Sequence, residues 1–245
     1  MAKTLLLLAL FVGTAFAAQP NSHFLENIFG FPESFYQNAA TNNNGGPLNG
    51  ATYNCDAAHL QQSQDAFNSA LGIGGTLNWQ NATQLYSAVD AYLSASVSNY
   101  LNTCKARKNF YTQMGATYAD CTNPLYIVSQ LSSGSDVTPA FAYAAMWAQL
   151  DFICNAGLEI GIQSFKDIMA VYGTQQGQTC YNQFLIGAGN DPVNRCKYVS
   201  TYIVCIQEAY IQYASNRPNG WWVCERARVG FGMGCLNQRC TVLTT

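Results

Sequence analysis

The chain has 245 residues, of which only 10% are charged, and its formal net charge is −2. A typical protein carries about 25% charged residues. Because nucleic-acid binding needs a concentrated basic face, this composition argues against nucleic acid as a partner. The ten cysteines, an even number, predict five disulfides formed in an oxidising compartment.

The first residues have the pattern of a targeting segment. Lys3 precedes an apolar run over residues 5–12, and the small-x-small sequence Ala15-Phe16-Ala17 follows. This order is typical of a secretory signal peptide, and the run is too short to span a bilayer. We therefore expect residues 1–17 to be a signal peptide and the protein to be secreted into the extracellular space.

Residues 18–50 contain no cysteine and divide into two parts. The stretch from His23 to Tyr36 is rich in aromatic residues, and residues 38–50 are mostly Asn, Gly and small residues. This composition predicts a flexible N-terminal arm followed by an Asn/Gly linker. Phe29 and Phe31 are candidate contacts with a partner groove or with a second copy of the chain. The alternative is that the arm packs over the core of its own domain.

From Cys55 onward, apolar residues recur at helical spacing, so residues 51–245 are predicted to form one helical, cysteine-rich domain. Asn81-Ala82-Thr83 is an N-glycosylation sequon, which predicts a glycan on Asn81 at the surface. One amphipathic helix is predicted from the stripe Leu85, Tyr86, Val89, Tyr92, Leu93, Val97, Tyr100, Leu101 and Cys104.

Residues 141–172 form the most apolar part of the domain. The spacing predicts a buried central helix, in which Gly157 and Gly161 introduce kinks. Polar residues exclude a membrane span here, because each is costly in hydrocarbon; they are Gln149, Asp151, Asn155 and Glu159. No other segment predicts a span.

The last third of the chain repeats the helical stripe over residues 198–213. Three sites place a capping side chain before a proline and predict helix starts: Asn123-Pro124, Thr138-Pro139 and Asp191-Pro192. Glycines predict helix ends at positions 72, 115, 134 and 173. Alternating strand patterns are missing, so the predicted fold is an all-α, disulfide-linked bundle of six or seven helices.

The disulfide cysteines are predicted to be Cys55, Cys104, Cys121, Cys154, Cys180, Cys196, Cys205, Cys224, Cys235 and Cys240. Their connectivity does not follow from the sequence. Some neighbours flank turns, as Cys104 and Cys121 do, and a bridge that closes a loop of ~15 residues stabilises the fold by roughly 3 kcal/mol.

Catalytic motifs are missing from the sequence. Of the two histidines, His59 lies near Asp56, and this spacing favours a surface pair over a catalytic one. Three carboxylates at intervals of eight, Asp151, Glu159 and Asp167, turn progressively off any single helix face. We therefore expect no catalytic, cofactor-binding or metal-binding residues.

A turn at Asn219-Gly220 is followed by Trp221 and Trp222, and exposed indoles bind sugars or anchor protein interfaces. The alternative places Trp222 in the core beside the disulfide of Cys224.

The sequence favours a secreted, non-enzymatic interaction or extracellular-matrix-type protein that recognises protein, glycan or itself. The alternatives are an extracellular carrier of an apolar small ligand and a carboxylate-dependent secreted hydrolase.

Overall fold

The computed structural model describes residues 52–131, 135–171, 174–214 and 216–241, and all regular secondary structure in these ranges is helical. The predicted signal peptide, the arm with Phe29 and Phe31, and the linker lie outside the described residues. Within the described ranges, none of the helices is both long and apolar enough to cross a membrane.

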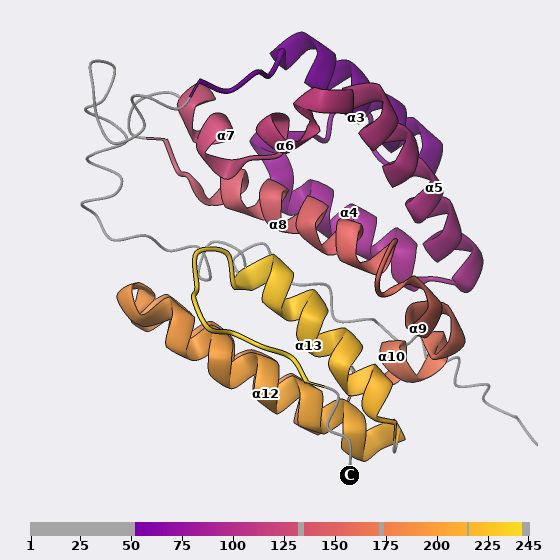
Figure 1. Ribbon diagram of the computed structural model, residues 1–245, viewed down its shortest axis with the longest axis vertical. Helices are drawn as coiled ribbons and strands as arrows, with labels where there is room; N and C mark the ends of the chain where they lie inside the picture. Colours follow the sequence, from indigo (N-terminus) through magenta and orange to yellow (C-terminus); the bar gives the residue numbers. More distant parts are fainter. Residues whose placement is uncertain (1–51, 132–134, 172–173, 215, 242–245) are drawn as a thin grey trace, which may run out of the picture.

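The helices form two groups joined by a short connection (Figure 1). The first group comprises α3 (Ala57–Leu71), α4 (Ala82–Ser94), α5 (Val97–Met114), α6 (Tyr118–Cys121), α7 (Pro124–Gln130) and α8 (Thr138–Ile153). The connection is α9 (Leu158–Gln163) and α10 (Phe165–Val171), and the second group is α11 (Gln175–Asn190), α12 (Arg195–Ala214) and α13 (Arg217–Phe231). Single 3-10 turns are η1 (Trp79–Asn81), η2 (Gly115–Thr117) and η3 (Pro192–Asn194).

The all-α prediction is confirmed, but the number of helices is larger than predicted. Nine α-helices in the described ranges have seven residues or more, against the expected six or seven. Two predicted helices are divided in the structure. The periodic stripes continue across the breaks, so periodicity alone did not reveal them.

The first division separates α4 from α5. Ser96 has extended backbone angles, and its hydroxyl accepts a hydrogen bond from the Asn99 backbone N–H at 3.1 Å, so it caps a new helix. The change of direction also alters which residues are buried. Tyr100 is fully buried, whereas Leu101, predicted on the same buried stripe, is 45% exposed.

The second division interrupts the predicted central helix after Ile153. The chain turns through residues 154–157 and resumes as α9 and then α10. Gly157 and Gly161 both lie where a side chain does not fit. A Cβ on Gly157 would lie 2.8 Å from the Trp222 indole nitrogen, and one on Gly161 would lie 2.3 Å from the Tyr100 hydroxyl. These glycines therefore allow α9 to approach the core closely.

Helix α8 lies at the centre of the fold, between α4, α5 and α7 on one side and α13 on the other (Figure 1). Thirteen of its sixteen residues are buried, which confirms a central helix that is apolar on nearly every side. Its Trp147 stacks on Phe110 of α5 with ring centroids 3.9 Å apart, and it meets Phe67 of α3 edge-on at 5.0 Å.

Of the three helix starts predicted at a residue before proline, one is confirmed and two differ in the capping residue or in the first residue of the helix. Asn123 caps α7 as expected, with its side chain accepting from the Leu125 N–H. At α8 the N-cap is Val137, which has no capping side chain; Thr138 is the first residue of the helix, and its N–H donates to Asp136 Oδ1 at 2.9 Å. Asp191 precedes the η3 turn, and α12 begins only at Arg195.

All ten cysteines are paired, which indicates an oxidising environment. The bridges join Cys55 to Cys121, Cys104 to Cys154, Cys180 to Cys205, Cys196 to Cys235 and Cys224 to Cys240. Cysteines that flank a turn in the sequence, such as Cys104 and Cys121, bond to other partners. Cys180–Cys205 joins α11 to α12, and each of the other four bridges joins a helix to a cysteine that lies outside the helices.

Candidate functional site

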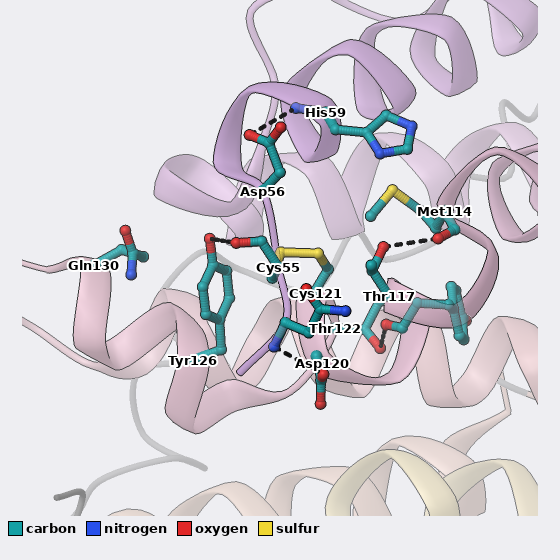
Figure 2. Close-up of a disulfide and its surroundings, with 12 residues drawn as sticks. Cys55, Asp56, His59, Met114, Thr117, Asp120, Cys121, Thr122, Tyr126 and Gln130 are labelled. Atoms are coloured by element: carbon teal, nitrogen blue, oxygen red, sulfur yellow. Dashed lines mark hydrogen bonds between the residues drawn. A yellow bond between two sulfur atoms is a disulfide. The ribbon is translucent and has the colours of Figure 1, made fainter. Parts of the chain in front are cut away.

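The predicted pair of an aspartate and a histidine is a helix cap. Asp56 Oδ1 accepts hydrogen bonds from the backbone N–H groups of Ala58 at 2.9 Å and His59 at 3.5 Å, and so begins α3. Figure 2 shows the His59 imidazole directed away from the Asp56 carboxylate. The two side chains therefore do not form an acid–base pair.

The surroundings of this cap anchor the start of the described chain (Figure 2). The Cys55–Cys121 disulfide joins it to α6, and the Asn54 N–H donates to the Asp120 carboxylate at 2.9 Å. The Tyr126 hydroxyl of α7 donates to the Cys55 carbonyl at 3.5 Å. Burial raises the pKa of Tyr126, so the phenol stays protonated as a donor. These contacts have a structural role.

A buried polar network links the two helical groups. Arg226 of α13, only 8% exposed, forms an ion pair with Asp90 of α4. Its Nε donates at 3.1 Å to Gln149 Oε1 of α8, which also accepts from the Tyr86 hydroxyl at 2.8 Å. These side chains border a cavity of about 20 Å³, which has room for roughly one water molecule. The arrangement is too small for an organic ligand.

A second ion pair occupies the interface of α5, α6 and α8. Asp151 accepts from Arg107 Nε at 2.6 Å and from the Tyr118 hydroxyl at 2.7 Å. Burial, and then the Asp151 charge, raise the pKa of Tyr118. Burial alone lowers the pKa of Arg107, but Asp151 and Tyr118 outweigh it and the net shift is upward. The guanidinium also lies 5.0 Å from the Tyr111 ring centroid. The Asp151 carboxylate is therefore paired with side chains from the neighbouring helices α5 and α6.

The other two carboxylates considered for hydrolysis face solvent. Glu159 on α9 is exposed and accepts from Gln163 at 3.0 Å, and Asp167 is exposed on α10. Because the predicted central helix is broken, these residues and Asp151 lie on three different helices. No group of three or more His, Cys, Asp or Glu side chains in the described ranges is placed to hold a metal ion.

The tryptophan pair is divided between the core and the surface. Trp222 is fully buried, and its indole N–H donates to the Gly157 carbonyl at 2.8 Å. Trp221 is partly exposed and meets Phe152 edge-on with centroids 5.6 Å apart. The structure thus places Trp222 beside the buried Cys224, as in the alternative interpretation, and only Trp221 reaches solvent.

The sequon lies at the junction of η1 and α4. The Asn81 side chain is half-buried; its oxygen accepts from the Asn78 N–H at 2.7 Å, and its nitrogen donates to the Thr76 carbonyl at 3.2 Å. Thr83 is 8% exposed. Glycosylation of Asn81 stays a prediction.

Exposed large hydrophobic side chains gather in one part of the chain. Five of the seven in the described ranges lie between residues 186 and 236. The three most exposed are Ile186 at 64%, Val193 at 74% and Leu236 at 86%. We call these three residues the α11–α12 corner, because they lie at the end of α11, in η3 and beside the start of α12.

Covalent and packing contacts bring the corner together. The Cys196–Cys235 disulfide, with 5.3 Å between Cα atoms, holds Leu236 beside the first turn of α12. Gly187 lies against the Tyr198 ring, where an added Cβ would be 2.3 Å away, so the end of α11 sits directly on that turn. The corner was not predicted from the sequence. Its only local signal is Val193 and Leu236, single apolar residues in polar, turn-forming stretches.

Two basic side chains, Lys197 and Arg239, are exposed near the corner. Arg195 has a different role, because its guanidinium donates to the carbonyls of Phe231 and Met233. Burial lowers the pKa of Arg195. The corner is therefore an apolar surface with basic neighbours, and it holds no nucleophile or acid–base pair.

No protein-family model matches the sequence, and comparisons with curated proteins and with solved structures found no match.

Proposed function

We propose that the chain is a secreted, non-enzymatic interaction protein that binds another extracellular protein through the α11–α12 corner. The observation that carries this proposal is that the three most exposed large hydrophobic side chains of the described ranges, Ile186, Val193 and Leu236, all lie at this corner. Neighbouring exposed apolar side chains mark interaction sites more often than single scattered ones do.

Secretion is supported by two independent features. The signal-peptide pattern of residues 1–17 predicts export, and the five disulfides require an oxidising compartment. The bridges also suit an extracellular binding module, because they hold its surface in one conformation and so lower the entropy lost on binding.

A protein partner fits the corner better than a glycan. Sugar recognition relies on aromatic faces, whereas Ile186, Val193 and Leu236 are aliphatic. Of the two indoles considered for sugar binding, that of Trp222 lies inside the core and that of Trp221 is only partly exposed. Aliphatic side chains with basic neighbours suit a partner surface that is apolar at its centre and acidic at its rim.

The other two candidate functions have less support. A carrier needs a cavity of ~300 Å³ or more, whereas the polar network borders a space of about 20 Å³. A hydrolase needs two carboxylates that converge on a substrate. Asp151 is engaged by Arg107 and Tyr118, and Glu159 and Asp167 are exposed on separate short helices.

The test is capture of partners from the extracellular fluid in which the protein occurs. The bait is the full secreted chain, compared with Val193→Asp and Leu236→Asp variants. Leu101→Asp is the matched control, because Leu101 is also an exposed leucine but lies on α5. Capture is quantified by mass spectrometry of the eluate.

We expect a partner protein that is lost from both corner variants and retained by Leu101→Asp. Each buried aliphatic anchor contributes about 1.5–3 kcal/mol, so one charge in its place lowers affinity at least tenfold. Equal capture by all the variants, or capture of glycan without protein, would overturn the proposal. Retention of the chain inside secretory cells would contradict its secretion.

A further inference from the structure

We propose that residues 24–36 of the N-terminal arm dock on the α11–α12 corner of the same molecule. The inference rests on the proposed function only for the choice of surface. The arm would cover the corner, whose three apolar side chains are otherwise exposed to water.

The arm has the composition of a docking segment. Its large apolar residues are Phe24, Leu25, Ile28, Phe29, Phe31, Phe35 and Tyr36. Segments that stay in solvent usually lack such residues, because exposing apolar surface to water is unfavourable. The corner offers the complementary surface, with Leu236 86% exposed and Val193 74% exposed.

The charges of the two surfaces are complementary. The arm contains Glu26 and Glu33, and no Lys or Arg occurs between Lys3 and Lys105. Lys197 and Arg239 are exposed beside the corner. One acid, Asp191, also lies at the corner and accepts hydrogen bonds from Asn194 at 2.9 and 3.1 Å, so the formal charge of Lys197, Arg239 and Asp191 together is positive. The charges therefore favour the arm in this position over a basic segment.

The linker is long enough to reach. The described chain starts at Thr52, beside α6 and α7, and residues 37–51 connect it to the arm. These fifteen residues span up to about 50 Å when extended. A compact domain of this size has a radius of gyration of about 16 Å, so it is roughly 40 Å across. The arm can thus reach the corner without unfolding any helix.

Tethering favours the same molecule over a second copy. A short flexible linker gives its attached segment an effective concentration in the millimolar range. A second copy of a secreted protein at micromolar concentration competes poorly with that.

The test is limited proteolysis of the full secreted chain with chymotrypsin, which cuts after the aromatic residues of the arm. Intact-mass analysis follows loss of the arm with time. The variants are Val193→Asp and Leu236→Asp, with Leu101→Asp as the control on α5. Circular dichroism checks that each variant keeps its helices, which is expected because all three side chains are exposed.

We expect the arm to be cut about tenfold faster in both corner variants than in the wild-type chain and the control. The wild-type rate should not depend on protein concentration, and sedimentation should show a monomer. Equal cutting in all four proteins would overturn the inference. Protection that grows with concentration alongside a dimer would also overturn it, in favour of docking between copies.

The outcome is separable from that of the proposed function. Arm protection is measured without any partner, and partner capture is measured without protease. An unprotected arm with capture lost in the corner variants refutes only the docking of the arm. A protected arm with capture unchanged refutes only the corner as the partner site.

Discussion

At the scale of single residues, Gly161 sets how closely α9 approaches the core. A Cβ there would lie 2.3 Å from the Tyr100 hydroxyl oxygen and 2.8 Å from its ring. Tyr100 is fully buried, and its hydroxyl donates to the Ile153 carbonyl at 2.8 Å, so it has no room to move aside. Alanine favours helix over glycine by about 1 kcal/mol, but the overlap outweighs this gain.

We therefore predict that Gly161→Ala lowers the free energy of unfolding by about 1–3 kcal/mol. Gly75→Ala is the control, because nothing lies within 4 Å of a Cβ at Gly75 and its φ is not positive. That change should be neutral or slightly stabilising. Urea denaturation measures both, and equal stabilities of the two variants would contradict the overlap.

The ion pair of Asp90 and Arg226 is the second decisive contact at this scale. Replacing Asp90 with Asn leaves the largely buried guanidinium without its counter-charge. We expect Asp90→Asn to reduce stability by about 2–3 kcal/mol, less than for a fully buried pair because Asp90 is 29% exposed. The exposed Glu159→Gln should change stability by less than about 0.5 kcal/mol. Similar losses in both variants would show that the pair contributes nothing beyond a surface charge.

At the scale of elements, the segment after α13 acts as a strap over the second helical group. It returns along α12 and α13 (Figure 1), and disulfides hold it to both helices through Cys196–Cys235 and Cys224–Cys240. The Gln207 side chain donates to the Thr241 carbonyl at 2.7 Å. The strap thus depends on long-range covalent links as well as on hydrogen bonds.

Removing the Cys224–Cys240 bridge with Cys224→Ser and Cys240→Ser together should cost about 3 kcal/mol, as a loop of 16 residues predicts. Removing Cys55–Cys121 in the same way should cost about 4 kcal/mol, because its loop spans 66 residues. Guanidinium denaturation measures the loss of unfolding free energy in each double variant. If the entropy of the unfolded chain dominates, the loss is larger for the longer loop. A larger loss for the shorter loop would indicate that packing around Cys224 decides instead.

At the scale of the whole molecule, buried phenols make stability sensitive to alkaline pH. Burial raises the pKa of Tyr100, Tyr118 and Tyr143 above the ordinary value of about 10. In the unfolded chain these phenols lose their protons near that ordinary value, while the folded protein retains them. Above about pH 10 the unfolded state therefore binds fewer protons, and the free energy of unfolding falls as the pH rises.

We predict that these three phenols leave the free energy of unfolding unchanged below about pH 9. As the pH rises above about 10, each phenol lowers that free energy by up to about 1.4 kcal/mol per pH unit. Urea denaturation across this range measures the loss, and tyrosinate absorbance should rise together with unfolding. Absorbance that rises fully while the helical signal persists would show that these phenols ionise inside the folded protein.

How far the sequence predicted the structure differed between elements. The stripe over residues 198–213 was confirmed by α12, which buries Val199, Tyr202 and Ile206, because a long amphipathic pattern is a local property. The prediction of a continuous helix over residues 85–104 was wrong. Ser96 caps a new helix there, although the apolar periodicity continues across the break. The carboxylates at intervals of eight lie on three helices because the chain turns at residues 154–157 and again at Ser164.

The sequence by itself determined the all-α class, the apolar first part of the central helix and the pairing of all ten cysteines as a set. These follow from local periodicity, capping chemistry and an even cysteine count. Only the tertiary structure decided the partner of each cysteine, the burial of Trp222 and the exposure of Ile186, Val193 and Leu236. These properties depend on which distant helices pack together, and α8 and α13 meet only after the chain has turned at residues 154–157.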